Sequence, residues 1–271
     1  MKYIALAFML FIGFNLCSQK EKKPDEKVKV FYKDAAAETD DYKIYIEDAV
    51  AVGNQSKFKM RVFNKTNDYL LIKPSEITFT ADGKTFTSQD RTFVIPPNDE
   101  SHLVIDFKGS GMQFENYSLD VKGIYKASAG GKIAEIPNFE LPATKKEFTA
   151  GNFLCTLKKS DSKTDKTVAR FECAYNGDGV GVIQPNKAVA IMPNGTDNAN
   201  GKKTKAQVLE KGVTEDFTVL FTEVKGAGDM QKKAIQIKWG ETFRESKLVL
   251  LKSVAVNMQK DVTTPQEKPQ K

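Results

Sequence analysis

The feature that most constrains the fold is an alternation of apolar and polar side chains with a period of two residues. Successive side chains of a β-strand point to opposite faces, so this period predicts half-buried strands. Turn-forming pairs such as Asp82-Gly83 and Asn194-Gly195 separate the alternating segments. Many short strands with frequent turns favour β-sandwiches or barrels over folds with alternating helices. The inward residues of the clearest segments are Tyr42, Ile44 and Ile46; Phe58, Met60 and Val62; Leu103, Ile105 and Phe107; Phe217, Val219 and Phe221; and Ile235, Ile237 and Trp239.

An internal repeat is the second organising feature of the sequence. The segment Ile72-Lys73-Pro74 matches Ile183-Gln184-Pro185 at an offset of 111 residues. Further along, residues 108–112 (KGSGM) match residues 225–230 (KGAGDM), and the offset at the first lysine is 117. The matches keep their order and their inward phase, and a longer loop at 194–201 in the second copy fits the larger offset. A period of this length predicts domain duplication rather than a solenoid of short repeats.

The repeat predicts two tandem domains, at residues 40–145 and 146–258. With 271 residues, of which 40% are hydrophobic, the chain has enough apolar material for two cores. Residues 19–39 are rich in Lys, Glu and Asp and predict a flexible charged linker. Residues 259–271 are rich in Pro, Gln and Lys and predict a disordered tail.

The first 18 residues have the pattern of a secretory signal peptide. Lys2 precedes an apolar run at positions 4–14 that is too short to span a membrane readily. Either signal peptidase cuts after Ser18, or Cys17 is lipidated, although Leu16 stands where a lipoprotein signal has a small residue. We therefore expect an exported protein, periplasmic or secreted, or alternatively anchored by lipid to the outer membrane or cell surface. Membrane attachment is expected only if Cys17 is lipidated.

Several local patterns together resemble a known kind of domain. An Asn-containing polar loop at Asn64, an Asp82-Gly83 hairpin and a Pro-Pro-Asn-Asp turn at 96–99 precede or follow predicted strands. This pattern resembles the immunoglobulin-like β-sandwich domains of unknown function in bacterial surface lipoproteins. Residues 18–21, directly after Cys17, likewise resemble the surface-export signals of some Bacteroidota lipoproteins. The resemblance implies two immunoglobulin-like sandwiches of about seven strands each, an extracytoplasmic location and no known activity.

Two of the three cysteines are predicted to form a structural disulfide. A hairpin centred near Thr164 would place Cys155 directly opposite Cys173. The repeat offset of 111 aligns these residues with Ile44 and Val62, which belong to inward-facing segments. An exported protein meets oxidising conditions, so we expect a buried bridge in place of an aliphatic contact. Two buried free thiols are the alternative, and a redox-active pair is disfavoured because inward cysteines are poorly accessible.

No catalytic, metal-binding or cofactor-binding residues are predicted. His102 is the only histidine and lies on the outward face of its strand, with no evident nucleophile to activate. The loop at 196–201 lacks the ligand pattern of a calcium loop, and Trp239 is in phase with core residues. The net charge of +6 is spread over interspersed lysines and acids, which gives no indication of nucleic-acid binding.

The leading hypothesis is a non-catalytic binding or structural protein of the cell envelope that presents loops or strand edges to a protein or glycan partner. A second hypothesis is a periplasmic assembly factor or chaperone that acts by strand addition. A third is a hydrolase with two carboxylates on an open sheet face. The candidate binding residues are Lys108, Gly109, Gly111, Asn194, Asp197, Asn200, Lys225, Gly226 and Gly228.

Overall fold

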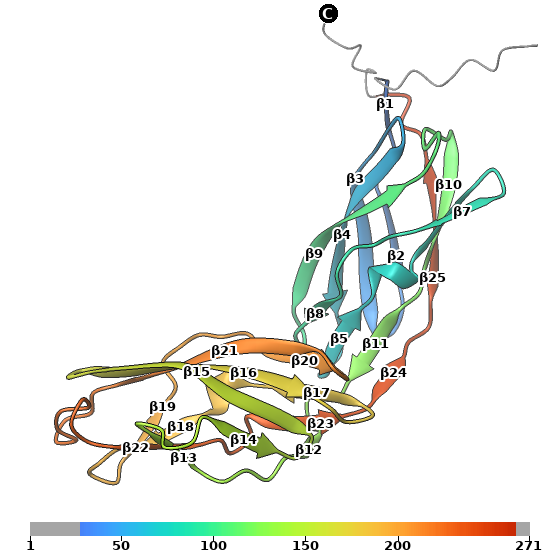
Figure 1. Ribbon diagram of the computed structural model, residues 1–271. Helices are drawn as coiled ribbons and strands as arrows, with labels where there is room; N and C mark the ends of the chain where they lie inside the picture. The colour runs from blue at the N-terminus through green and yellow to red at the C-terminus, as the bar shows by residue number, and fades with distance from the viewer. Residues whose placement is uncertain (1–27, 264–271) are drawn as a thin grey trace, which may run out of the picture.

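The computed structural model describes residues 28–263 as an all-β chain bent into an L (Figure 1). One arm, the first unit, has a core built from residues between 30 and 124 together with Val256 and Met258. The other arm, the second unit, has a core built from residues between 134 and 243. Two short 3-10 turns, η1 (Pro74–Glu76) and η2 (Pro185–Lys187), are the only helical segments among the described residues. The prediction of an all-β chain is confirmed.

The first unit contains two layers of antiparallel strands that face each other across its core. One layer has the order β1-β3-β4-β9, with β2 also paired to β3. The other consists of the runs β25-β10-β6-β7 and β24-β11-β5-β8, in which β5 continues through η1 into β6. The bounds are β1 Lys29–Phe31, β2 Ala35–Glu38, β3 Tyr42–Val52, β4 Gln55–Asn64, β5 Tyr69–Ile72, β6 Thr78–Ala81, β7 Lys84–Thr87, β8 Phe93–Ile95, β9 Glu100–Lys108, β10 Asn116–Val121, β11 Ile124–Ala127, β24 Leu248–Leu250 and β25 Val254–Gln259.

The second unit has the same kind of layering. One layer has the order β14-β15-β16-β21, and the other consists of the runs β12-β23-β17-β20 and β13-β22-β18-β19. The bounds are β12 Lys132–Ile133, β13 Phe139–Leu141, β14 Glu147–Ala150, β15 Phe153–Lys163, β16 Lys166–Tyr175, β17 Val180–Ile183, β18 Val189–Ile191, β19 Asp197–Ala199, β20 Gln207–Glu210, β21 Thr214–Thr222, β22 Ile235–Lys238 and β23 Phe243–Ser246.

The apolar alternation places side chains in the cores as expected. All of the predicted inward residues are buried except Leu103, which is half-buried. In the second core, Trp239 stacks on Phe148 with ring centroids 5.1 Å apart and meets Phe171 edge-on at 5.2 Å. Burying such side chains contributes roughly 1.5–3 kcal/mol each, so the alternating faces supply the main driving force for packing the two layers.

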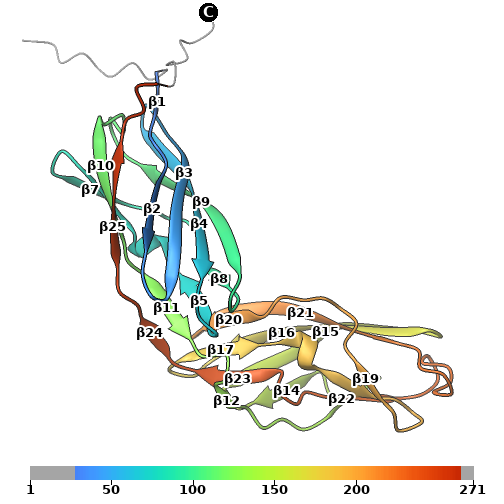
Figure 2. The same ribbon diagram turned by 180° about the vertical axis from the view of Figure 1, so that it is seen from behind.

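The second unit is inserted between two segments of the first unit. After β11 of the first unit, the chain enters β12 and β13, which pair with β23 and β22 of the second unit. After β23 of the second unit, it enters β24 and β25, which pair with β11 and β10 of the first unit. The second unit is therefore formed by the consecutive strands β12–β23, and the first unit is completed by β24 and β25 after the chain returns, as the paths of β12 and β24 near the bend show (Figure 2).

This arrangement differs from the predicted domain boundaries. They place 254–258 in the second domain, but β25 lies in the first unit with Leu119 opposite Val256. They place 134–141 in the first domain, but Phe139 and Leu141 are buried in the second core. The physical reason is that each of these strands has apolar side chains that fill the core of the unit it joins.

The predicted linker and tail also contain ordered chain. Strands β1 and β2 lie within 19–39 and pair with β3, and Val30 and Tyr32 are buried in the first core. Within 259–271, Gln259 ends β25 and Lys260 forms a bridge with Tyr32. Backbone hydrogen bonds form this short ladder, in which the N–H of Lys33 donates to Gln259 O at 2.9 Å. The predicted signal peptide and Cys17 lie outside the described residues.

The predicted disulfide is confirmed. Cys155 and Cys173 are bonded, fully buried and directly opposite each other in the β15–β16 hairpin. Their Cα atoms are 4.1 Å apart. The turn itself differs slightly from the expectation, because Lys163 pairs with Lys166 and a bulge at Lys158 restores the register before the cysteines.

A small apolar cluster joins the two units at the bend. Tyr69 and Ala127 of the first unit pack with Val180 and Val182 of the second, and all four are buried. Gln184 donates from Nε2 to the Tyr69 hydroxyl at 2.9 Å. Both faces of β5 and β17 are covered here, which is why all four residues of each strand are buried. The two arms are therefore joined at the bend by these contacts and by the chain connections β11 to β12 and β23 to β24.

Candidate functional site

The first candidate loop, residues 108–112, is fixed to a neighbouring hairpin at the end of the first unit. The Gly109 N–H donates to Asn54 O at 2.9 Å, and the Met112 N–H donates to Gly53 O at 3.0 Å. The Met112 side chain is fully buried. A Cβ on Gly109 would lie 2.2 Å from the Phe86 ring, so this glycine is required by close packing.

The second candidate loop, residues 225–230, is held in the same way at the far end of the second unit. The Glu223 N–H donates to Asp165 O at 2.7 Å, and the Met230 N–H donates to Thr164 O at 3.3 Å. Met230 is buried like Met112. Gly228 has a φ of +81°, a conformation that glycine adopts at little cost. The glycines of both loops therefore have structural explanations.

The third candidate loop, residues 194–201, lies beside the second. A methyl group on Gly226 would lie 3.9 Å from Asn194 Nδ2. Asn194 Oδ1 accepts from the Thr196 hydroxyl at 2.7 Å, and Asp197 pairs with Lys238 at 2.7 Å. The structure thus brings residues 194–201 and 225–230 together at the tip of the second unit and places residues 108–112 at the opposite end of the molecule (Figure 1).

Asn200 has a different role from the other loop residues. Its Oδ1 accepts from the Leu220 N–H at 2.8 Å, and its Nδ2 donates to Pro185 O at 2.8 Å. These bonds fix the segment after β19 against the edge of β21. Asn200 therefore covers a strand edge and is not available as a free recognition group.

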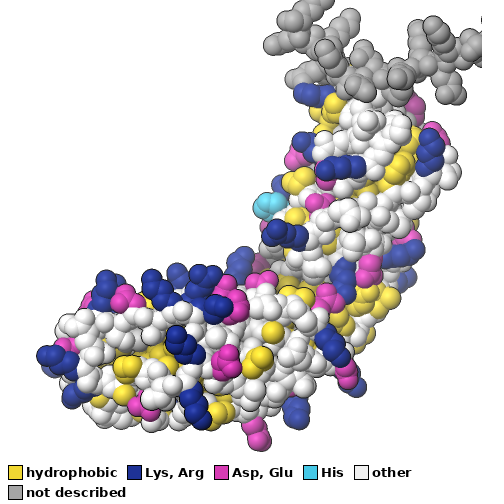
Figure 3. Space-filling view, viewed as in Figure 1, with side chains coloured by type: hydrophobic (Ala, Val, Ile, Leu, Met, Phe, Trp, Pro, Cys, Tyr) yellow, Lys and Arg dark blue, Asp and Glu magenta, His cyan; other side chains and the backbone are white. Residues whose placement is uncertain are grey.

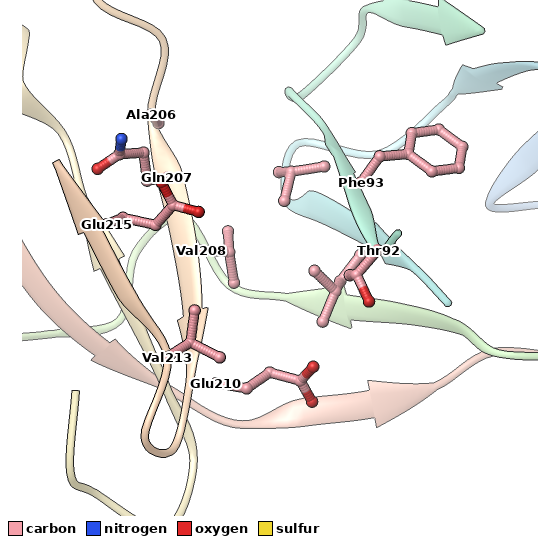
Figure 4. A pocket seen from close by; sticks show the side chains of 10 residues that line it. Thr92, Phe93, Ala206, Gln207, Val208, Glu210, Val213 and Glu215 are labelled. Atoms are coloured by element: carbon pink, nitrogen blue, oxygen red, sulfur yellow. The ribbon is translucent and has the colours of Figure 1, made fainter. Parts of the chain in front are cut away.

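A cleft of about 280 Å³ lies at the inner angle of the L. Thr92 and Phe93 contribute from the first unit, and Val208 and Glu215 contribute from the second (Figure 4). Leu71 and Val94 of the first unit also line the cleft. Figure 3 shows hydrophobic side chains gathered near the bend, with charges of both signs scattered over the arms. Sequence reasoning missed this cleft because it arises from the relative placement of two units, and no local pattern encodes that placement.

A cluster of charged and aromatic groups borders the cleft. The Lys73 ammonium pairs with Glu210 of the second unit and lies 4.9 Å from the centroid of the Tyr125 ring. The Tyr125 hydroxyl donates to Glu76 Oε2 at 2.8 Å. Burial raises the pKa of Tyr125 to about 12, and the Glu76 carboxylate adds to the effect. Tyr125 therefore stays protonated at neutral pH and acts as a hydrogen-bond donor in this cluster.

A second hollow, of about 370 Å³, has two carboxylates in its lining, Asp90 and Asp106, next to Lys108. Asp90 Oδ2 accepts from the Asp106 N–H at 2.8 Å and from the Ser88 hydroxyl at 2.5 Å. Asp106 Oδ2 accepts from Gln55 Nε2 at 2.7 Å. These bonds hold the segment after β7 against β9, so both carboxylates have a structural role.

His102 and Trp239 lie where the sequence predicted. His102 is exposed on the outer face of β9, opposite Arg61 of β4. Arg61 is held by Glu47, with Nη2 and Oε1 2.7 Å apart, and its guanidinium lies 4.1 Å from the centroid of Tyr45. Trp239 is 1% exposed, so its ring cannot serve as a stacking surface for a sugar.

Comparison with models of known protein families gives no match, and a search of curated proteins gives none either. Within residues 28–263, no helix is long and apolar enough to cross a membrane.

Proposed function

We propose that this protein is an exported, non-catalytic binding protein of the cell envelope. In this proposal, two tandem immunoglobulin-like units present loops or strand edges to a protein or glycan partner. The chain is periplasmic or secreted, or anchored through a lipid on Cys17.

The observation that carries the proposal is the position of the chain ends. The Asp261 N–H donates to Phe31 O at 2.8 Å, and Tyr32 bridges Lys260, so the two ends of the described chain lie side by side. Both lie at the tip of the first unit, and the bend and the second unit extend away from it (Figure 1). A chain tethered by its N-terminal segment would therefore hold the inner angle and the distal loops away from its attachment point.

Equivalent elements in the two units support the proposed duplication. In each, a strand ends in a Pro-led 3-10 turn, η1 or η2. Ile44 faces Val62 in the β3–β4 hairpin as Cys155 faces Cys173 in the β15–β16 hairpin. Sheets with the orders β3-β4-β9 and β10-β6-β7, linked by crossovers, have the connectivity expected of immunoglobulin-like sandwiches.

The disulfide supports export. Structural disulfides persist in oxidising compartments and are rare in the cytosol. The bridge is buried in the second core, where it crosslinks two central strands.

Mass spectrometry of the mature protein isolated from its source tests the proposal. We expect a chain that begins at Gln19 without lipid, or at a lipidated Cys17, with Cys155 and Cys173 oxidised. A chain that retains residues 1–18 and has reduced cysteines would contradict export.

A further inference from the structure

The edge of β9 is an open strand edge on the inner side of the bend, as both views of the molecule show (Figures 1 and 2). Strand β9 pairs on one side with β4 and ends its sheet on the other. The Asn64 N–H donates to Asp99 O, and the Gly109 N–H donates to Asn54 O, each at 2.9 Å. In antiparallel pairing the bonded residues alternate, so the odd-numbered residues of β9 bond to β4.

The even-numbered residues of β9 consequently direct their backbone groups away from the sheet. The Asp106 N–H is covered by Asp90 Oδ2 at 2.8 Å, and the Glu100 N–H by Asp99 Oδ1 at 2.8 Å. Between them, the N–H and C=O groups of His102 and Val104 have no protein partner within residues 28–263. Both residues are exposed.

The matching strand of the second unit is closed by its own chain. In β21 the Leu220 N–H donates to Asn200 Oδ1, and Leu220 O accepts from the Gly201 N–H, both at 2.8 Å. Asp216 O accepts from Gln207 Nε2 at 2.8 Å. A further bond joins Asn198 Nδ2 to Thr222 O at 2.5 Å. Residues 198–207 thus bond to the outer edge of β21 at Asp216 and Leu220, on both sides of Thr218. In the described part of the first unit, bonds of this kind cover the edge of β9 only at Glu100 and Asp106, outside His102 and Val104.

Apolar side chains flank the open edge. Val104 is 53% exposed on the outer face of β9, and Phe63 is 38% exposed on the same face of β4. On the inner face, Leu103 is half-buried against the first core. A strand laid along β9 would extend both faces and cover part of this apolar surface.

We infer that the β9 edge binds an extended segment of a partner polypeptide by strand addition at His102 and Val104. The unpaired groups alternate donor and acceptor along the strand, two residues or roughly 6.8 Å apart. Another backbone in β conformation matches that pattern residue by residue, and a glycan does not. The partner segment would carry apolar side chains on the face that meets Val104. This inference rests on the proposed binding function. It deepens that function by naming the class of partner.

Amide hydrogen exchange, measured on the full-length protein with its disulfide intact, tests strand addition at this site. The probe is a synthetic ten-residue peptide of alternating Val and Thr between terminal lysine pairs, because strand addition draws its affinity from the backbone. We expect saturating peptide to slow exchange at the His102 and Val104 amides at least tenfold. The Thr218 amide, which lies between the covered positions Asp216 and Leu220 of β21, should be unaffected.

Two proline variants distinguish an effect on the β9 edge from a general effect on the fold. The Val104 N–H points away from β4, so Val104→Pro removes a free donor without breaking a bond to β4. Thr218→Pro makes the same change in β21, where Thr218 faces Arg170 as Val104 faces Lys59. We expect V104P to weaken peptide binding at least tenfold and T218P to leave it unchanged. The hydrogen-exchange measurement uses the unaltered protein, so it tests peptide binding at the β9 edge even if V104P does not fold.

Three results would overturn the inference. These are absence of protection at millimolar peptide, equal protection at Thr218, and concentration-dependent self-association that alone protects His102 and Val104. The last would identify a second copy of this chain as the occupant. None of these results alters the mass of the mature protein, so failure here is distinguishable from failure of the export proposal.

Discussion

At the scale of single residues, the clearest lesson comes from two pairs that occupy the same place in their hairpins. Ile44 and Val62 are fully buried opposite each other in the first unit. Cys155 and Cys173 take this place in the second unit, where they form the disulfide. The sequence could predict this bridge because the repeat supplied the inward phase and the hairpin supplied the register. Both are local properties of the chain.

The equivalence predicts that a disulfide can be transplanted into the first unit. In the variant I44C/V62C the two thiols would be directly opposed, as in the native bridge, and we expect them to oxidise. The closed loop would match the native separation of 18 residues, so oxidation should stabilise the variant by about 3 kcal/mol relative to its reduced form. Thiol counting and urea unfolding measure both effects. The diagonal pair I44C/M60C is the control, and bridging there but not in I44C/V62C would contradict the register.

Tyr42 predicts a loss of stability at high pH. It is fully buried, and its hydroxyl donates to Lys252 O at 2.5 Å in the segment between β24 and β25. Burial, with a smaller effect of Asp41, raises its pKa from 10.0 to about 12. A raised tyrosine pKa stabilises the fold below pH 10, and this contribution is lost as the pH rises through 12.

Absorbance at 295 nm should therefore show Tyr42 ionising near pH 12, in the same range as Tyr125, together with loss of structure. Tyr42→Phe should remove one tyrosine from the absorbance change near pH 12 and cost about 1 kcal/mol at neutral pH through the lost hydrogen bond. Tyr45→Phe, on the outer face of the same strand, is the control. An unchanged titration in Y42F would contradict the assignment.

At the scale of elements, the sequence indicates strands well and their partners poorly. Val256 and Met258 alternate with the polar residues Asn257 and Gln259, so the sequence indicates a strand there. No local sequence feature indicates that this strand pairs with β10, more than 130 residues earlier, instead of β22. Likewise, no local sequence feature indicates the pairing partner of β13. Two similar sheets offer similar open edges, and the choice between them depends on chain connections at the bend.

The pairing of β25 with β10 predicts that the C-terminal strand is essential to the first unit. Deleting residues 254–271 removes Val256 and Met258 from the first core and leaves the edge of β10 unpaired. Two buried side chains of this size contribute roughly 3–6 kcal/mol, a large share of the stability of a typical domain. We expect the first unit to unfold or bind a hydrophobic dye, while Trp239 in the second core keeps its buried emission.

Deleting only residues 264–271, which lie outside the described chain, is the control and should change neither signal. Urea unfolding followed by circular dichroism and by tryptophan fluorescence distinguishes the two units. If the longer deletion left both transitions unchanged, β25 would not complete the first unit.

At the scale of the whole molecule, the bend places loops and strand edges relative to one another in a way that the sequence could not predict. Of the three candidate loops, two meet at the distal tip and one lies at the opposite end of the molecule. The cleft at the inner angle combines β5, β8, β20 and β21, which have no shared motif. The open edge of β9 lies at His102 and Val104, whereas in β21 the residue that matches His102 is Asp216, whose carbonyl is covered by Gln207. Recognition at this angle is the central claim for function.

Site-specific photo-crosslinking in living source cells tests that claim most directly. A benzophenone side chain at Val104 would face any partner in the inner angle, and the same group at Thr218 would lie on the matching but covered edge. We predict a light-dependent adduct at Val104, with the crosslink mapped to an extended partner segment, and none at Thr218. Absence of an adduct at Val104, or equal adducts at both positions, would contradict the account.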